Sequence, residues 1–424
     1  MKQYLKLTIC LLAVLPYNPT FAQENNGGDS LILKVQQMHS LFNTLSKIKL
    51  SGYIQAQFQA ATADGAKTYE GGNFPDESGN RFMVRRGRLK VQHTDMISLS
   101  VLQIDVTEKG VGIKDVYVTL SEPWVNSFSL TVGVFNRPFG FEIPYSSSER
   151  ESPERGRMSQ IIFPGERDLG AMLSFKLPET SALKFLRLDA GLFNGNGTAT
   201  DFDNNKDFIG RIRLNEIFKN DVVKFSVGGS YYKGVWRQEN ATLYEIGTDV
   251  NNVQTFIEGP GFGKSGRGAP REYFGGDAQL EIKWVAGKTI LRGEYIFGEQ
   301  SGLANSTTSP SSSTQPAGNV YLRNFDGAYF YFIHNILKSK HQLVVKYDWY
   351  DPNTDVEGNQ IGNIFNNLGS AEIKYESLGF GWNFQMSNHL KFMAFYQTVK
   401  NESTSISPED VKDDVMTLRL QHKF

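Results

Sequence analysis

The feature of this sequence that most constrains its fold is an alternation of apolar and polar side chains with a period of two residues. Between positions 51 and 59 the even positions are small or apolar, and all but one of the odd positions are Ser or Gln. A period of two places apolar side chains on one face of a strand and polar side chains on the other. The alternation recurs up to the last residue, so the sequence predicts an all-β fold whose strands each have one apolar and one wet face.

Sixteen segments of this kind follow one another along the chain, each 10 to 14 residues long. Such lengths are close to the roughly 9–11 residues with which a tilted strand crosses a bilayer. The predicted strands are 49–60, 81–93, 96–106, 112–121, 127–136, 168–178, 184–194, 207–217, 222–233, 273–284, 288–298, 325–334, 341–350, 371–384, 389–400 and 414–424.

The connections between these strands are predicted to alternate between long loops and short turns without an exception. The long ones are 61–80, 107–111, 137–167, 195–206, 234–272, 299–324, 351–370 and 401–413. The short ones lie near 94–95, 122–126, 179–183, 218–221, 285–287, 335–340 and 385–388. Long loops at one end of the strands and short turns at the other are typical of a transmembrane β-barrel, in which the short turns are periplasmic and the longer loops are extracellular. We therefore expect a 16-stranded antiparallel barrel with both termini on the periplasmic side.

A closed barrel also agrees with the distribution of apolar residues. The longest mostly apolar run, Leu7–Leu15, is far shorter than the roughly 20 residues of a membrane-spanning helix, which excludes a helical membrane protein. In a barrel each strand needs only one apolar face, because lipid lies outside and water fills the lumen. The chain has 30 Phe, 18 Tyr and 5 Trp, and those near strand ends are expected to form interfacial girdles: Tyr53, Trp124, Tyr231, Tyr232, Trp284, Tyr350 and Tyr396.

The first residues have the pattern of an export signal. Lys2 and Lys6 precede the apolar run Leu7–Leu15, and Ala22 offers a small residue at a cleavage point before Gln23. This pattern predicts a cleaved signal peptide over residues 1–22. The single cysteine of the chain, Cys10, would leave with it.

A short helical segment is predicted between the signal peptide and the barrel domain, within residues 23–48. From Asp29 to Ile48 the apolar residues repeat at spacings of four and three, which indicates one apolar stripe on a helix. The stripe consists of Leu31, Val35, Met38, Phe42 and Leu45. Fewer than three heptads are too short for an isolated coiled coil. The segment therefore either docks on the rest of the molecule or self-associates in an oligomer, below the membrane in the periplasm, and residues 49–424 form the barrel.

Basic residues alternate on the wet face of two predicted strands. Arg86, Arg88 and Lys90 share one face of the second strand, and Arg211 and Arg213 share one face of the eighth. Rings of Arg or Lys suit an anion pore, and the planar fork of Arg suits phosphate or carboxylate. These five residues are candidate pore-lining, anion-binding residues.

The third long loop, 137–167, is rich in charges of both signs. It contains Arg137 at its entrance and Arg150, Arg155, Arg157 and Arg167 farther along. It also contains Glu142, Glu149, Glu151, Glu154 and Glu166. Two interpretations stay open: the arginines line a constriction and bind anions, or they form a salt-bridge network that holds the loop against the wall.

Several of these stretches resemble the phosphate-selective porin O and P family. The segment 81–91 is similar to the R-R-x-x-L motif of that family's second strand. Residues 133–140, 147–150 and 165–170 are similar in order to its pore loop, and 418–424 is similar to its closing strand, in which His422 departs from the usual residue. The resemblance implies a sixteen-stranded, usually trimeric porin with the third long loop folded inward as the constriction. It also implies that Phe424 acts as an assembly signal.

The sequence thus predicts an outer-membrane porin for passive diffusion of small hydrophilic solutes, with a preference for phosphate or other small anions. Its expected partners are these solutes, outer-membrane lipid and two further copies of the chain. A formal charge of −1 gives no indication of nucleic-acid binding, and no enzyme, cofactor or metal site is expected. Two alternatives stay open: a surface adhesion or ligand-binding barrel with an occluded lumen, and an outer-membrane hydrolase using Ser226 and His422.

Overall fold

The structure is a computed structural model and describes residues 27–220, 222–239, 242–259, 268–316 and 318–424. The predicted signal peptide, 1–22, lies outside these residues. The chain divides into two units, 1–47 and 48–424. The first contains the helix α1 (Gly27–Ser46) and the second contains all strands.

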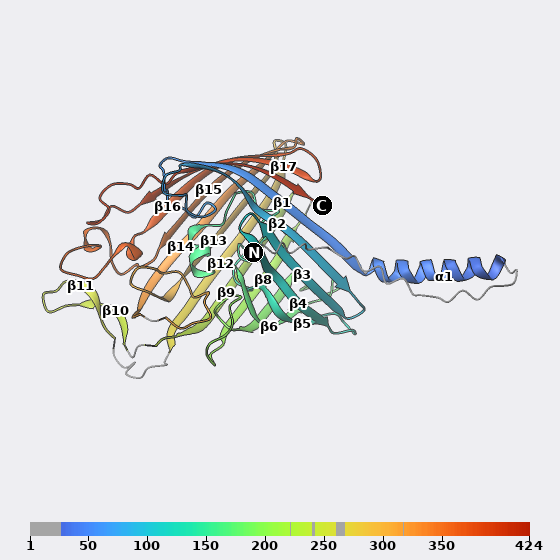
Figure 1. The fold of residues 1–424 in the computed structure, drawn as a ribbon, viewed down its shortest axis with the longest axis horizontal. Coiled ribbons are helices and arrows are strands. Elements are labelled where there is room, and N and C mark those ends of the chain that lie inside the picture. The colour runs from blue at the N-terminus through green and yellow to red at the C-terminus, as the bar shows by residue number, and fades with distance from the viewer. Residues whose placement is uncertain (1–26, 221, 240–241, 260–267, 317) are drawn as a thin grey trace, which may run out of the picture. The chain divides into compact units, whose positions relative to one another are not determined.

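Sixteen strands form the wall of the second unit (Figure 1). They are β1 (Ile48–Ala61), β2 (Asn80–Thr94), β3 (Ser98–Thr107), β4 (Gly110–Ser121), β5 (Phe128–Asn136), β6 (Arg167–Lys176), β7 (Leu186–Phe193), β8 (Asp207–Lys219), β9 (Val223–Arg237), β12 (Gly268–Trp284), β13 (Gly287–Gly302), β14 (Val320–Ile336), β15 (His341–Asp351), β16 (Tyr375–Gln385), β17 (Leu390–Asn401) and β18 (Val415–Lys423). The remaining elements are the strands β10 (Leu243–Thr248) and β11 (Gln254–Glu258), the helix α2 (Arg157–Ile162), and single 3₁₀ turns at Gly358–Gln360 and Ser370–Glu372.

Each wall strand pairs antiparallel with the next, β9 pairs with β12, and β1 pairs with β18. The last pairing, which we call the seam, runs from Tyr53 opposite Lys423 to Ala61 opposite Val415. The sheet is therefore closed, and all sixteen predicted strands are confirmed. Closure satisfies the backbone hydrogen bonds of every strand, as hydrocarbon requires.

The expectation that every second connection is long is wrong at one place. Strands β3 and β4 are joined by Glu108 and Lys109 alone, because Thr107 already pairs with Gly110. Gly110 has φ +125°, a conformation that favours glycine and permits this tight turn. The wall therefore has no long loop at this position.

Two further boundaries differ from the prediction. The predicted loop 234–272 contains the hairpin β10–β11, and β10 pairs in parallel with the start of β14. Phe256 of β11 packs with Val356, Ile361 and Leu368 of the loop 352–374, so the hairpin is held by apolar contacts that a period of two does not reveal. The predicted strand 371–384 begins only at Tyr375, because a 3₁₀ turn occupies Ser370–Glu372.

The outer face of the wall is apolar, as predicted. Exposed side chains on it include Leu102, Val118, Val132, Phe274, Phe330 and Trp382. Three of the expected girdle aromatics are nevertheless not in this face: Tyr53, Tyr232 and Tyr350 are buried. They lie inside the barrel, because each is an even number of positions away from the other inward-facing residues of its strand.

The helix α1 confirms the predicted helical segment, with its ends shifted by two residues. Its apolar side chains Val35, Met38, Phe42 and Leu45 are all exposed, Met38 and Phe42 by 70%. None of the described helices is long and apolar enough to span a membrane.

Candidate functional site

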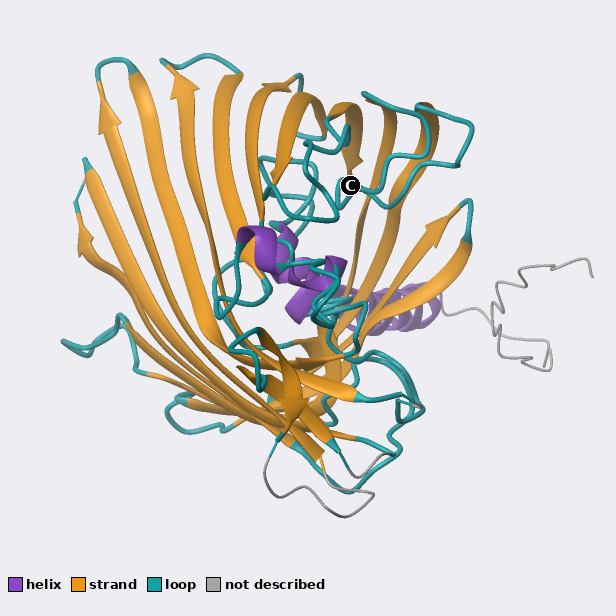
Figure 2. Cartoon of the chain, turned by 90° about the vertical axis from the view of Figure 1, so that its left-hand side faces the viewer, coloured by secondary structure: helices purple, strands orange, loops and turns teal. Residues whose placement is uncertain are grey.

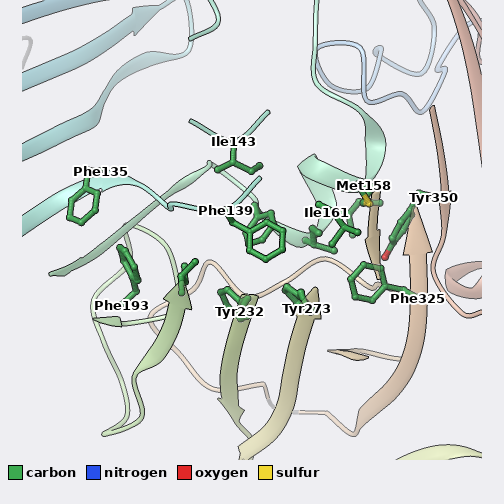
Figure 3. Close-up of a cluster of buried hydrophobic side chains, with 14 residues drawn as sticks. Phe135, Phe139, Ile143, Met158, Ile161, Phe193, Tyr232, Tyr273, Phe325 and Tyr350 are labelled. Atoms are coloured by element: carbon green, nitrogen blue, oxygen red, sulfur yellow. The ribbon is translucent and has the colours of Figure 1, made fainter. Parts of the chain in front are cut away.

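The segment 137–166, which we call the inner loop, lies within the ring of strands (Figure 2). Its residues Phe139, Ile143, Met158, Ile161 and Phe163 are buried against inward-facing side chains of the wall (Figure 3). The wall contributes Phe193, Ile209, Tyr232, Tyr273, Ile296, Phe325 and Tyr350. Burial of aromatic and aliphatic side chains anchors the loop. One side of the barrel interior is therefore filled by side chains and not by water. The sequence analysis did not predict this cluster.

The entrance of the inner loop is fixed at a close contact with strand β13. The backbone N–H groups of Phe141 and Glu142 donate to Glu294 Oε2 at 3.0 and 3.1 Å, and the N–H of Gly140 donates to Ser230 Oγ at 3.0 Å. Gly140 has φ +57°, and a Cβ there would lie 1.6 Å from Glu294 Oε1. Only glycine permits this approach.

Farther along, the inner loop is held by one carboxylate among arginines. Glu154 is buried, with Arg85 Nε at 2.7 Å, Arg86 Nη2 at 2.6 Å and Arg419 Nη2 at 3.0 Å. Burial alone would raise the pKa of Glu154, but these guanidinium groups outweigh it and hold the pKa well below its usual value. The cluster ties the loop to β2 and β18, which lie on either side of β1.

A second group of charges holds the end of the inner loop. Arg155 donates to the backbone carbonyls of Glu142, Ile143 and Tyr145 and pairs with Glu166. Burial lowers the pKa of Arg155 to about 9. Arg167 bridges Glu166 and Asp115 of β4, each at 2.8 Å. The salt-bridge interpretation of the loop charges is therefore correct for Arg155 and Arg167, which also line the cavities described next.

Two neighbouring cavities remain between the inner loop and the wall. The upper cavity, about 270 Å³, lies toward the long loops, and the lower, about 260 Å³, lies toward the short turns. Both are lined by Arg88 and Arg155. We call the pair the basic cavities, because eight cationic side chains and four carboxylates line them. The cationic residues are Arg85, Arg86, Arg88, Lys90, Lys114, Arg155, Arg167 and Lys423, and the acidic ones are Asp105, Asp115, Glu154 and Glu166.

Two of these cations were not predicted from the sequence. A β-bulge in each of their strands reverses which side chains face the inside of the barrel. In β2 the register shifts so that Gln55 faces Arg86 but Ala56 faces Val84, which leaves Arg85 as the extra residue. In β4 Gln103 faces Asp115 but Ile104 faces Ile113, which leaves Lys114 as the extra residue. A bulge re-aims a side chain. Both residues line the upper cavity, although a strict period of two would place them on the outer wall.

The other predicted anion-binding residues lie outside the basic cavities, each beside a carboxylate. Arg137 pairs with Asp168 at 2.9 Å, Arg211 with Asp277 at 2.8 Å and Arg213 with Asp189 at 2.7 Å. Arg150 is buried with Glu154 at 3.8 Å, and Arg157 lies 3.7 Å from Asp413. Of the ten predicted residues, the structure therefore brings together Arg86, Arg88, Lys90, Arg155 and Arg167.

The last residue, Phe424, takes part in the seam. Its N–H donates to the carbonyl of Gly52, and its own carbonyl accepts from the N–H of Gly52, both at 3.0 Å. A Cβ on Gly52 would lie 2.6 Å from the ring of Phe424, so the ring covers the glycine. The role of Phe424 as an assembly signal stays a prediction.

The two residues considered for a hydrolase, Ser226 and His422, lie on strands that are not neighbours. Ser226 is on β9 and accepts the N–H of Glu216, whereas His422 is on β18, which does not pair with β9, and stacks near His389 and Phe424. Among the described residues, no three His, Cys, Asp or Glu side chains are grouped so that they could hold a metal ion.

Comparison with known proteins gives similarity in fold alone. No protein family and no curated protein matches the sequence. The fold is similar to that of OprB from Pseudomonas putida in its high-pH structure (TM-score 0.58, 10% identity, 92% of this chain and 97% of that one). It is also similar to Salmonella typhi OmpF in complex with daunomycin (0.55, 11%, 89% and 97%) and to the outer membrane channel DcaP of Acinetobacter baumannii (0.52, 13%, 89% and 97%). The chain thus has the transmembrane barrel fold of outer-membrane porins, and these likenesses do not single out the phosphate-selective ones.

Proposed function

We propose that this chain is an outer-membrane channel for passive diffusion of small hydrophilic solutes, with a preference for phosphate or other small anions. The observation that carries the proposal is the continuous lining of the two basic cavities, in which cations outnumber carboxylates eight to four. Arg88 and Arg155 line both cavities, and we place the constriction of the channel between these two residues. A solute would cross the constriction by passing these two guanidinium groups.

The anion preference is supported by two lysines without a carboxylate partner. Among the described residues, neither Lys90 nor Lys114 has an acidic oxygen within 4 Å, in contrast to Arg86 and Arg167. An unpaired ammonium group in a narrow cavity attracts anions, and low-dielectric walls focus its field. The paired arginines supply rigid walls and N–H donors, so that binding stays weak enough for a solute to leave.

Several properties that follow from this function are also proposals. A signal peptide over residues 1–22 would direct the chain to the outer membrane, Phe424 would serve as the assembly signal, and three copies would associate. The exposed apolar wall supports contact with lipid or with another copy. The exposed stripe of α1 supports association of the copies through that helix.

Reversal potentials of the purified protein in planar bilayers test the permeation proposal. In a potassium chloride gradient we expect chloride to pass more readily than potassium, and added phosphate to reduce the chloride current. Cation selectivity would contradict the anion preference. Absence of any conductance would contradict the channel and favour a ligand-binding barrel with an occluded lumen.

A further inference from the structure

A third cavity, of about 640 Å³, lies at the long-loop end of the barrel, and we call it the vestibule. Its lining comes from the loop 62–79, the inner loop, the loop 303–319, the segment 350–375 and the loop 402–414. Five separate stretches of chain therefore converge on one space of the size typical for small-molecule sites. None of the proposed permeation chemistry uses it.

Arg157 presents unused hydrogen-bond donors in this vestibule. Its guanidinium carbon lies 3.5 Å from the ring centre of Tyr375 and 4.8 Å from that of Tyr69. The two rings hold the guanidinium group in place. Among the described residues its side chain makes no hydrogen bond, because the nearest carboxylate oxygen, Asp413 Oδ2, is 3.7 Å away. A guanidinium group has five N–H donors, so a ligand can take several of them.

Asp413 presents an unused acceptor beside these donors. Only 3% of the residue is exposed, Oδ1 has no hydrogen-bond partner, and Oδ2 lies 3.7 Å from Arg157 Nη2. A buried polar atom without a partner is costly unless something binds it. Donor and acceptor therefore lie next to each other in the wall of the vestibule, too far apart to satisfy one another.

The remaining polar lining of the vestibule is mostly uncharged. It consists of hydroxyl and amide side chains, among them Thr68, Asn73, Gln160, Thr307 and Ser370. Among the described residues, the only other charged lining residue is Lys67, which is exposed and lies 3.6 Å from Asp76. The positive charge of Arg157 is offset by Asp413, whose Oδ2 lies 3.7 Å from its guanidinium group. An anion would find no net positive charge here.

We propose that the vestibule binds a neutral polyhydroxylated ligand, a mono- or disaccharide. A hydroxyl group both donates and accepts, so neighbouring hydroxyls of one sugar can donate to the Asp413 carboxylate and accept from Arg157. The C–H faces of the ring can pack on the half-buried rings of Tyr69 and Tyr375, which line the same space. The proposal concerns binding and does not depend on permeation.

Titration calorimetry on the full chain tests the proposal, in an amine-oxide detergent that carries no sugar. The probes are glucose, maltose and sucrose, with inorganic phosphate and glycine as comparisons. We expect saturable binding of at least one sugar and none of phosphate. Absence of saturable sugar binding, or phosphate binding that Arg157→Ala abolishes, would overturn the proposal.

Variants of the vestibule locate the binding. Asp413→Ala is expected to weaken sugar binding at least tenfold, and Asp413→Asn, which keeps an acceptor oxygen, to restore part of it. Lys109→Ala, an exposed residue of the turn between β3 and β4 that does not line the vestibule, is the control and should bind as the wild type does. If Asp413→Ala fails to fold, Tyr375→Leu carries the same test with at least a fivefold loss. An unchanged affinity in the folded variants would also overturn the proposal, whereas conductance measured in parallel reports on the channel alone.

Discussion

Arg85 and Arg86 are neighbours in sequence, yet both bind the same carboxylate, that of Glu154. Their guanidinium nitrogens lie 2.7 and 2.6 Å from its two oxygens. Consecutive residues of a regular strand point to opposite faces, so this arrangement requires the bulge at Arg85. One added residue in a strand thus determines how the inner loop is held.

Removing the carboxylate at this point should loosen the inner loop. In Glu154→Gln the buried guanidinium groups of Arg86 and Arg419 and the partly exposed one of Arg85 lose their counter-charge. We expect a loss of about 3–5 kcal/mol in the free energy of unfolding, as for other broken buried pairs, measured by urea unfolding in detergent. Glu149→Gln is the control in the same loop: its partner Lys423 is half-exposed, so the loss should stay below about 1 kcal/mol. Equal losses in both variants would contradict the role of Glu154.

Charge reversal at a bulge residue should change ion selectivity. Lys114→Glu replaces an unpaired cation of the upper cavity by an anion, and each charge removed near the path costs a passing anion at least about 1 kcal/mol. The anion-to-cation permeability ratio should therefore fall by about fivefold or more. Lys109→Glu, an exposed residue of the turn between β3 and β4, should leave the ratio unchanged. The measurement is the reversal potential, and a similar change in both variants would point to a general surface effect.

The close approach of Gly140 to Glu294 predicts a large effect of one methyl group. In Gly140→Ala the added carbon collides with the Glu294 carboxylate, so the entrance of the inner loop must move. Gly165 also has a positive φ, +72°, but in Gly165→Ala the added Cβ meets nothing within 4 Å. It should cost only the backbone strain of about 1–2 kcal/mol. We expect limited proteolysis to cut the inner loop in Gly140→Ala far sooner than in Gly165→Ala.

Glu70 should make stability depend on pH. Burial raises the pKa of this loop residue to about 7 from 4.5, and both its carboxylate oxygens lack partners. Between these two values the folded state binds more protons than the unfolded state, so stability falls as the pH rises from about 4.5 to above 7. The urea midpoint should therefore be higher at pH 6 than at pH 8. Glu70→Gln should reduce this difference, and an unchanged difference would assign it to other groups.

The exposed stripe of α1 predicts a dependence of the oligomer on this helix. A variant without residues 27–46 should keep the barrel, because the barrel strands begin only at Ile48. We expect a trimer band on a mild gel for the full chain and its loss in the shortened variant. A stable trimer of the shortened chain would assign association to the barrel wall instead.

The sequence was sufficient to predict the wall and insufficient to predict its interior. The sixteen strands followed from a period of two, because an apolar outer face is required along every strand. The inner face has no such requirement: Tyr232 and Tyr273 fill it where the inner loop packs, and Arg88 lines a cavity where the loop leaves space. Which of these occurs depends on the path of the loop, which no local pattern encodes.

The same reason explains which site residues were found. Arg86, Arg88 and Lys90 follow the alternation of their strand and line the basic cavities, whereas their role in binding anions stays a prediction. Arg85 and Lys114 occupy bulges, and a bulge depends on the pairing with the neighbouring strand. The carboxylates that pair with Arg211 and Arg213 come from other strands, so their identity required the register of the sheet.

The seam has a consequence for how the molecule forms. Gln55 and Gln421, whose side chains are joined by a hydrogen bond of 2.6 Å, are separated by 366 residues. Contacts at such separation form slowly, because the entropy of closing the chain is lost before they are made. Until that moment β1 and β18 each present an unpaired edge, which is a template for aggregation. During assembly, the pairing of β1 with β18 within one chain therefore competes kinetically with pairing between different chains.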